Sequence, residues 1–250
     1  MEITSVNNDL VKEVVKLQQK KHRDETKKFL LEGYKAVEEA ISSKIKLDKI
    51  LLKKGAKHNF DEKNVIYVSE QVLKKISTTT TAPEIVAIGF QRTYNLDILK
   101  DAKKVALFEN INDLGNLGTI LRTSTAVDID AIILFGDTVD IYNPKCVRAS
   151  VGNLWKTPVF NVKDISVLEK YFGDFDRIAT LPKAKDTVEL KDYQTKNKTL
   201  VMFGAESSGL SDSLINFSFH GSSLSFQLGM ESRFKGKKSL KSKYTITRIA

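Results

Sequence analysis

The chain has 250 residues, of which 41% are hydrophobic, and its four prolines and thirteen glycines exclude a fibrous or low-complexity protein and favour one or two globular domains. No apolar run reaches the roughly 18 residues needed to span a bilayer, and the N-terminus lacks the apolar segment of a signal peptide. The net charge of +9 favours a polyanionic partner, most often nucleic acid, although a basic protein without such a partner accounts for it equally well.

The first quarter of the chain alternates helix and strand patterns. Residues 8–21 carry leucines and valines at helical spacing, and the KKHRDE stretch that ends them is expected to be a charged turn, either a solvated helix end or an RNA contact. A short strand is expected at residues 29–31, followed by a break at Gly33. The helix after the break places four apolar residues on one side: Ala36, Val37, Ala40 and Ile41.

The same alternation continues up to a linker. Residues 46–54 and 64–77 repeat the order of strand and helix, and residues 78–90 read as a loop that runs into a strand. We therefore expect residues 1–92 to form one small α/β domain and residues 93–103 to form a linker with a short helix.

The second half, residues 104–250, contains short apolar runs of strand length at residues 105–108, 131–135, 178–181 and 200–203. Runs of this kind are typical of parallel strands buried on both faces and joined by crossover helices. Ligands of such sheets bind beyond the carboxyl ends of the strands, so the loops after Phe108 and Phe203 are the places to expect a site.

The loop after Phe108 reads ENINDLGNLGTILRTS and leads to a helix expected to begin near Leu117. The side chains that could cap this helix are Asn110, Asn112, Asp113 and Asn116. Gly115 and Gly118 permit close backbone approach, and Arg122 lies on the second turn of the helix. The pattern has neither the dinucleotide-binding glycines nor the P-loop lysine, so by itself it fits a capped helix with an exposed arginine as well as a catalytic loop.

Two further segments carry polar chemistry. After Phe203, Gly204 and Gly209 bracket Glu206, a carboxylate that could bind a ligand or backbone amides; a turn that caps a helix is the alternative. In the segment DIYNPKCVRASVGNLW, Lys145 and Arg148 are three residues apart and would be neighbours on a helix, where they could hold a phosphate or simply face solvent.

Taken together, these segments resemble the SpoU/TrmH family of RNA ribose 2′-O-methyltransferases, in the knotted SPOUT class. NLGTILRTS is similar to the family's first motif, NPKCVRASVGNLWKTPV to its P-K-x-x-R-A-S-x-G segment, and FGAESSGLS to its G-x-E-x-x-G-L motif. The N-terminal stretch from Asn7 to Ile41 resembles the family's substrate-binding extension. The resemblance covers roughly residues 3–214 and depends on the order and spacing of the motifs more than on any one of them.

The resemblance implies an S-adenosylmethionine-dependent methyltransferase with a parallel Rossmann-like sheet and a deep trefoil knot, working as a homodimer on RNA. Position by position, it implies catalytic roles for Asn116, Arg122 and Glu206. The cofactor-binding positions in the G-x-E loop would be Gly204, Ala205, Gly209 and Leu210. Lysines and arginines on the KKHRDE stretch and in the central segment would contact RNA: Lys20, Lys21, Arg23, Lys145 and Arg148.

The C-terminus departs from the family pattern. The third motif, approximately I-P-M-x-G followed by S-L-N, has no counterpart, and residues 232–250 contain seven basic residues and no acid. The missing residues would complete the cofactor pocket, the knot and a catalytic serine/asparagine pair.

Three functions therefore compete. The first is 2′-O-methylation of large-subunit rRNA, because the N-terminal extension typifies that branch of the family. The second is an RNA-binding or ribosome-associated protein with an impaired methyltransferase domain, and the third is a tRNA 2′-O-methyltransferase. No metal is implied, because His22, His58 and His220 are scattered; with Cys146 as the single cysteine, a reducing cytoplasm is expected.

Overall fold

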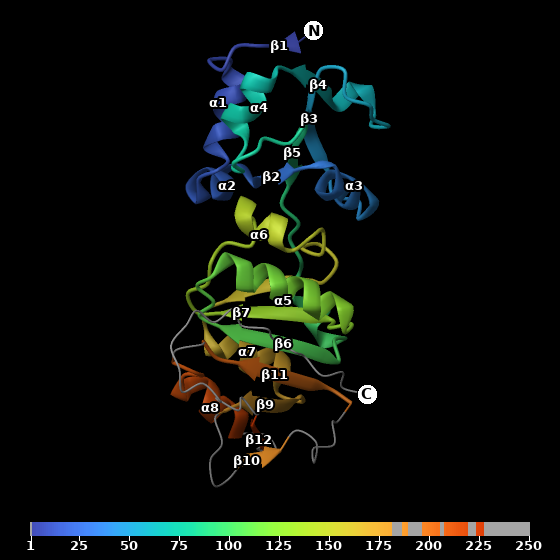
Figure 1. The fold of residues 1–250 in the computed structure, drawn as a ribbon. Coiled ribbons are helices and arrows are strands. Elements are labelled where there is room, and N and C mark those ends of the chain that lie inside the picture. Colours follow the sequence, from blue (N-terminus) through green and yellow to red (C-terminus); the bar gives the residue numbers. More distant parts are fainter. Residues whose placement is uncertain (1, 182–186, 190–196, 206–207, 220–223, 228–250) are drawn as a thin grey trace, which may run out of the picture.

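The computed structural model describes residues 2–181, 187–189, 197–205, 208–219 and 224–227. Two sheets lie one above the other along the molecule, and helix α6 (Pro144–Ala149) lies between them (Figure 1). None of the helices in these ranges is both long enough and apolar enough to cross a membrane.

The upper sheet is built by the N-terminal part of the chain and has the strand order β1-β4-β3-β5-β2. Its β5 is antiparallel to β2 and β3, while the remaining neighbours are parallel, so the sheet is mixed. The elements are β1 (Glu2–Ile3), α1 (Asp9–Lys16), α2 (Lys20–Thr26), β2 (Lys28–Glu32), α3 (Tyr34–Ser42), β3 (Leu47–Lys53), the 3-10 helix η1 (Glu62–Asn64), β4 (Val65–Val68), α4 (Glu70–Ile76) and β5 (Ile85–Phe90).

Local signals explain most of these boundaries. Asn8 caps α1 by accepting from the Leu10 amide, Ser69 caps α4, and Gly33 supplies the positive φ of 92° before α3. Two predictions are wrong. The KKHRDE stretch forms α2 rather than a turn, and Ile41 is exposed, because α3 turns this position toward solvent while Val37 and Ala40 are buried.

Within the described residues, the lower sheet has seven strands in the order β10-β12-β9-β11-β6-β7-β8, and all neighbouring strands in it are parallel. The predicted α/β class with a parallel C-terminal sheet is thereby confirmed. Its elements are the 3-10 helix η2 (Leu96–Lys100), β6 (Lys104–Glu109), α5 (Leu114–Ala126), β7 (Ala131–Phe135), α6, β8 (Val159–Val162), α7 (Ile165–Phe172), β9 (Asp176–Thr180), β10 (Thr187–Glu189), β11 (Thr199–Phe203), α8 (Asp212–Phe219) and β12 (Leu224–Gln227).

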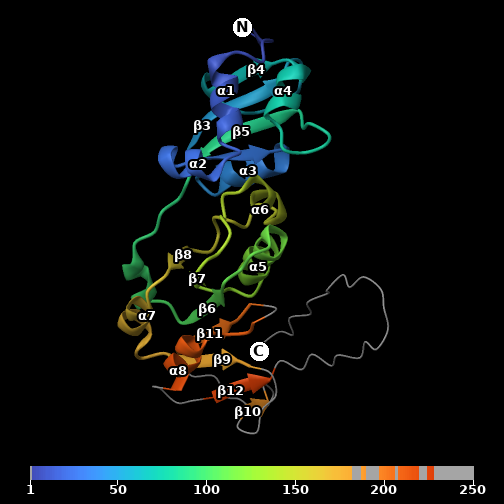
Figure 2. The same ribbon diagram turned by 90° about the vertical axis from the view of Figure 1, so that its left-hand side faces the viewer.

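Helices cover both faces of this sheet, which is why its strands read as continuous apolar runs (Figure 2). On β7, Ile132 and Leu134 pack in the cluster that includes α5 and α6, whereas Ile133 and Phe135 pack in the cluster that includes α7 and α8. Because successive residues of a strand point to opposite faces, every position of β7 is buried.

One hydrophobic cluster spans the two sheets, and each sheet has a further cluster on its other face. The cluster on the α5 and α6 side of the lower sheet continues into the upper sheet through Phe29, whose ring lies 4.9 Å from Tyr142 and 6.2 Å from Trp155. The boundaries placed at residues 92 and 103 stay predictions. The basic tail, the third motif and the closure of the knot fall largely on residues 228–250, which lie outside the described residues.

Candidate active site at the carboxyl ends of β6 and β11

The strand order changes direction between β6 and β11. From β6 the chain proceeds outward to β7 and β8, whereas β9 to β12 all lie on the other side of β6. The crevice beyond such a reversal is where ligands of open parallel sheets bind. Phe108 and Phe203 are register partners at this point and their rings stack at 5.1 Å, so the two loops expected to carry chemistry begin side by side.

Helix α5 begins earlier than predicted. Asp113 is its N-cap and accepts from the Asn116 amide at 2.7 Å, so Asn116 lies in the first helical turn and not in the loop. Six residues of helix separate Asn116 from Arg122, which is about 9 Å along the axis and roughly 120° around it. Arg122 is exposed, and within the described residues no hydrogen bond or ion pair joins the two side chains. One copy of the chain therefore does not bring these two predicted catalytic residues into contact.

Gly118 has a packing role. A Cβ at this position would lie 2.4 Å from the Ala149 Cβ, so α5 and α6 approach each other at this glycine. Gly118, a glycine of the first motif that could have belonged to a ligand-binding loop, is thus the contact point of two helices.

The loop after β11 closes on itself. Ala205 and Gly209 exchange backbone hydrogen bonds of 3.1 and 2.9 Å, and Gly209 has a φ of 68°. A Cβ on Gly204 would lie 2.0 Å from the Gly209 carbonyl carbon, so only glycine fits there. Leu210 is buried in the core and anchors the loop. Glu206 lies outside the described residues.

Glu109 joins the two loops, a role that was not predicted from the sequence. This carboxylate ends β6, is 4% exposed and accepts from the Ser211 amide at 2.7 Å. The available signal was an acid directly after the apolar run that forms β6, since a buried carboxylate needs hydrogen-bond donors.

A second hydrogen bond joins the loops after β6 and β7. Asn110 does not cap α5; it adopts a positive φ of 53° and its Oδ1 accepts from the Asp137 amide at 2.9 Å. A Cβ on Gly136 would lie 2.4 Å from that Oδ1. The loops after β6, β7 and β11 are thus bound to one another at the same edge of the sheet.

The predicted RNA contacts divide into two groups. Lys20, Lys21 and Lys145 are exposed, and the Lys145 Nζ lies 3.8 Å from Asp113. Arg23 is 1% exposed and pairs with Asp140 at 2.7 Å, which leaves it unavailable to a phosphate in this conformation.

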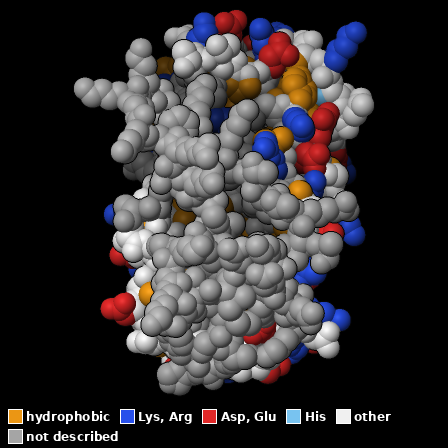
Figure 3. Space-filling model, turned by 60° about the horizontal axis from the view of Figure 1, so that its bottom comes forward, with side chains coloured by type: hydrophobic (Ala, Val, Ile, Leu, Met, Phe, Trp, Pro, Cys, Tyr) orange, Lys and Arg blue, Asp and Glu red, His pale blue; other side chains and the backbone are white. Residues whose placement is uncertain are grey.

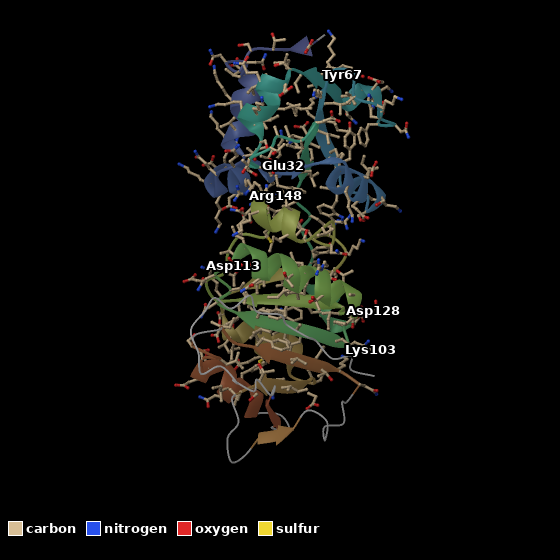
Figure 4. All side chains as sticks on the ribbon, viewed as in Figure 1. Glu32, Tyr67, Lys103, Asp113, Asp128 and Arg148 are labelled. Atoms are coloured by element: carbon tan, nitrogen blue, oxygen red, sulfur yellow. The ribbon has the colours of Figure 1, made fainter. Side chains whose placement is uncertain are left out.

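Arg148 is half-buried, and its guanidinium is paired like that of Arg23. It pairs with Glu32 of β2 and contacts the Thr78 hydroxyl, so its guanidinium is engaged by the upper domain (Figure 4). At the lower end of the molecule, basic and acidic side chains are interspersed along the right-hand edge of the face in Figure 3. That edge therefore shows no exposed patch of a single charge, and Arg148 is already paired.

Candidate metal ligands and the cysteine are not arranged for catalysis in the described part of the chain. No group of three or more His, Cys, Asp or Glu residues lies within metal-binding reach there. His58 is within 3.1 Å of the Tyr67 hydroxyl, and His220 lies outside the described residues. Burial raises the pKa of the Cys146 thiol to about 12, so it stays protonated and unreactive.

Comparison with known proteins agrees with this architecture. Residues 8–87 match the model of the MRM3-like substrate binding domain, and residues 103–220 match that of the SpoU rRNA methylase family. An uncharacterised tRNA/rRNA methyltransferase of Synechocystis sp. is 32% identical over 87% of this chain and 83% of its own length. The 23S rRNA (guanosine(2553)-2′-O)-methyltransferase RlmP of Bacillus subtilis is 35% identical over 63% of this chain and 64% of its own.

A solved structure extends the likeness to the fold. The crystal structure of an AdoMet-bound rRNA methyltransferase from Sinorhizobium meliloti has a TM-score of 0.79 and 25% identity, covering 95% of this chain and 92% of that one. The fold class expected from the sequence motifs is therefore confirmed in both halves of the chain.

Proposed function

The chain belongs to the SpoU rRNA methylase family, and we propose that it transfers a methyl group from S-adenosylmethionine to a ribose 2′-hydroxyl of RNA, most specifically large-subunit rRNA. The observation that carries this proposal is the joint position of the two motif loops. The Glu109–Ser211 hydrogen bond holds the loop after β11 against the end of β6, at the reversal of strand order. A B. subtilis relative named for 2′-O-methylation of 23S rRNA supports the choice of substrate.

The residues present fit the cofactor. At Gly204 a Cβ would lie 2.0 Å from the Gly209 carbonyl carbon, and at Gly136 it would lie 2.4 Å from the Asn110 side-chain oxygen, so both loops pack closely at glycines, where main-chain donors and acceptors are the groups available to a ligand. Such groups suit the adenine and amino-acid ends of S-adenosylmethionine. When bound, this cofactor supplies an electrophilic methyl group. Gly204, Ala205 and Gly209 would hold it through their backbones, while Leu210 keeps the loop in place from the core.

Arg122 is proposed to act on the RNA. A guanidinium is effectively never deprotonated in proteins, so it would stabilise charge that develops on the attacking oxygen and hold the adjacent phosphate rather than remove a proton. Asn116 would orient the ribose, and Glu206 would position Arg122 or a backbone amide. The exposure of Arg122 and its distance from Asn116 support a homodimer in which the two residues serve a shared site.

RNA binding is proposed for the N-terminal domain and its neighbourhood. Lys20 and Lys21 on α2 and Lys145 on α6 are exposed cations available to phosphates. A cytoplasmic location is also proposed, supported by the use of a single cysteine.

Titration calorimetry with S-adenosylmethionine tests the cofactor, and methyl transfer to 23S rRNA transcripts followed by mapping of 2′-O-methylated riboses tests the reaction. We expect saturable binding and one modified ribose. Absence of heat at high micromolar cofactor would instead favour an RNA-binding protein with an impaired methyltransferase domain. Modified tRNA with untouched rRNA would favour the tRNA enzyme.

A further inference from the structure

Arg148 and Glu32 connect the two halves of the molecule through an ion pair whose carboxylate is buried and whose guanidinium is half-buried. Glu32 ends β2 and its side chain is 2% exposed, while Arg148 lies in the last turn of α6. The same carboxylate accepts from the Thr78 amide at 2.6 Å and from the Thr78 hydroxyl at 2.7 Å. Figure 4 shows Glu32 and Arg148 next to each other at the junction of the upper sheet and α6.

Part of the interface around this pair is apolar, and ion pairs such as Arg23–Asp140 cross it as well. Phe29 from the upper sheet packs against Tyr142 and Trp155, and all three belong to one core cluster. Apolar contact holds two surfaces together but is non-directional, so it sets no angle between them. A charged pair with fixed hydrogen-bond geometry is directional, and breaking a buried one leaves an uncompensated charge. The Glu32–Arg148 pair is therefore one part of the interface that can define orientation, together with Arg23–Asp140, and it is the pair carried by α6 itself.

Helix α6 transmits this orientation to the candidate active site. Ala149 follows Arg148 directly and packs against Gly118 of α5, where a Cβ on Gly118 would lie 2.4 Å from the Ala149 Cβ. Helix α5 carries Asn116 and Arg122. A continuous set of contacts thus runs from Glu32 in the domain proposed to bind RNA to the helix proposed to act on the ribose.

We propose that Glu32 and Arg148 are positioning residues: their ion pair fixes the angle at which RNA held by the N-terminal domain is presented to α5. This inference rests on the proposed function. It replaces the role of phosphate contact expected for Arg148, because that guanidinium is already paired. Since a displacement of about 1 Å can lower a rate about 100-fold, a small change in domain angle is sufficient to affect turnover.

The test uses the full-length protein and the variants Glu32→Gln, Arg148→Met and the double variant. Positioning predicts a kcat that is about 10- to 100-fold lower in each, with RNA affinity within about twofold of the wild type. The losses should be non-additive, so that the double variant resembles the single ones. Arg148→Lys, which keeps the charge, should recover part of the rate.

A direct RNA contact gives the opposite pattern and would overturn the proposal. Glu32→Gln would then free Arg148 and tighten RNA binding, while Arg148→Met would weaken it and reduce the salt slope by about one phosphate contact. The matched control is Lys156→Met, which removes the more exposed interdomain ion pair with Glu39 and should leave kcat unchanged.

Two measurements separate positioning from unfolding and from failure of the proposed function. Cofactor-binding stoichiometry should stay at the wild-type value in all variants; a fall in parallel with kcat would mean that the pair only stabilises the fold. Small-angle scattering should detect a broader distribution of domain angles in Glu32→Gln. If the wild-type protein is inactive, the proposed function fails. Independently of activity, a scattering profile of Glu32→Gln that equals the wild-type profile would refute the positioning role.

Discussion

Gly118 of α5 lies so close to Ala149 of α6 that a Cβ added to Gly118 would stand 2.4 Å from the Ala149 Cβ. The Ala149 Cβ is attached directly to the backbone and cannot rotate away, so the helices themselves would have to separate. This contact ties the proposed catalytic helix to the helix that meets the N-terminal domain.

Gly118→Ala should therefore destabilise the protein by about 1–2 kcal/mol. The exchange gains up to about 1 kcal/mol of helix propensity, but overpacking at a contact this short costs about 1–3 kcal/mol. Urea unfolding measures the difference. Thr119→Ala on the exposed side of the same helix serves as the control and should stay within about 0.5 kcal/mol of the wild type. A stabilised Gly118→Ala protein would contradict the packing described for α5 and α6.

Arg122→Ala should lower the rate of methyl transfer about 100-fold or more while leaving the cofactor affinity unchanged. The reason is the loss of a preorganised cation near the developing charge on the ribose oxygen. Single-turnover methylation of 23S rRNA transcripts and calorimetry measure the two quantities. Lys163→Ala, which removes an exposed cation on the β8–α7 loop, should retain the rate. Retained turnover in Arg122→Ala would refute the proposed role.

Gly204→Ala should weaken S-adenosylmethionine binding by at least about tenfold. The new methyl group would meet the Gly209 carbonyl carbon at 2.0 Å and open the loop that Ala205 and Gly209 close. Calorimetry gives the affinity. Gly173→Ala is the control, because its Cβ would meet its nearest neighbour at 3.3 Å. A wild-type affinity in Gly204→Ala would show that the cofactor does not depend on this loop.

Stability should fall as the pH rises above about 9. Burial raises the pKa of Cys146 to about 12, whereas the unfolded thiol has a pKa of about 8.5, so the unfolded state loses its proton first. From pH 8 to pH 10 this group alone should remove about 2 kcal/mol from the free energy of unfolding. Denaturant titrations at both pH values measure the loss, and in Cys146→Ala the loss should be smaller by that amount. Equal losses in both proteins would contradict the burial of the thiol.

Removal of residues 232–250 should weaken RNA binding and flatten its salt dependence. The segment holds seven basic residues and no acid, and it lies outside the described residues. Each phosphate contact that is lost lowers the slope of log K against log salt by about 0.7 to 0.9. Filter binding at several salt concentrations measures this slope. An unchanged slope would show that the tail makes no phosphate contacts.

The amino-acid sequence by itself determined the fold class and many of the elements. Apolar runs such as residues 131–135 are long enough and continuous enough to mark strands buried on both faces, and helix caps such as Asn8 mark boundaries by local hydrogen bonds. The order of the motifs also indicated the family. These features depend on neighbours within a few residues, so pattern and spacing are sufficient to identify them.

Only the tertiary structure decided what the charged residues do. In sequence, Arg23, Arg148 and Glu109 cannot be told from solvent-facing charges. In the structure they pair with Asp140, Glu32 and the Ser211 amide, each more than a hundred residues away, and Arg23 and Glu109 are buried. The placement of Asn116 on α5 likewise depended on the helix starting at Leu114. Hydrophobic periodicity indicates which face of a segment is buried. Whether a charged side chain is free to bind a ligand or is paired within the protein is decided only when distant elements pack around it and exclude water.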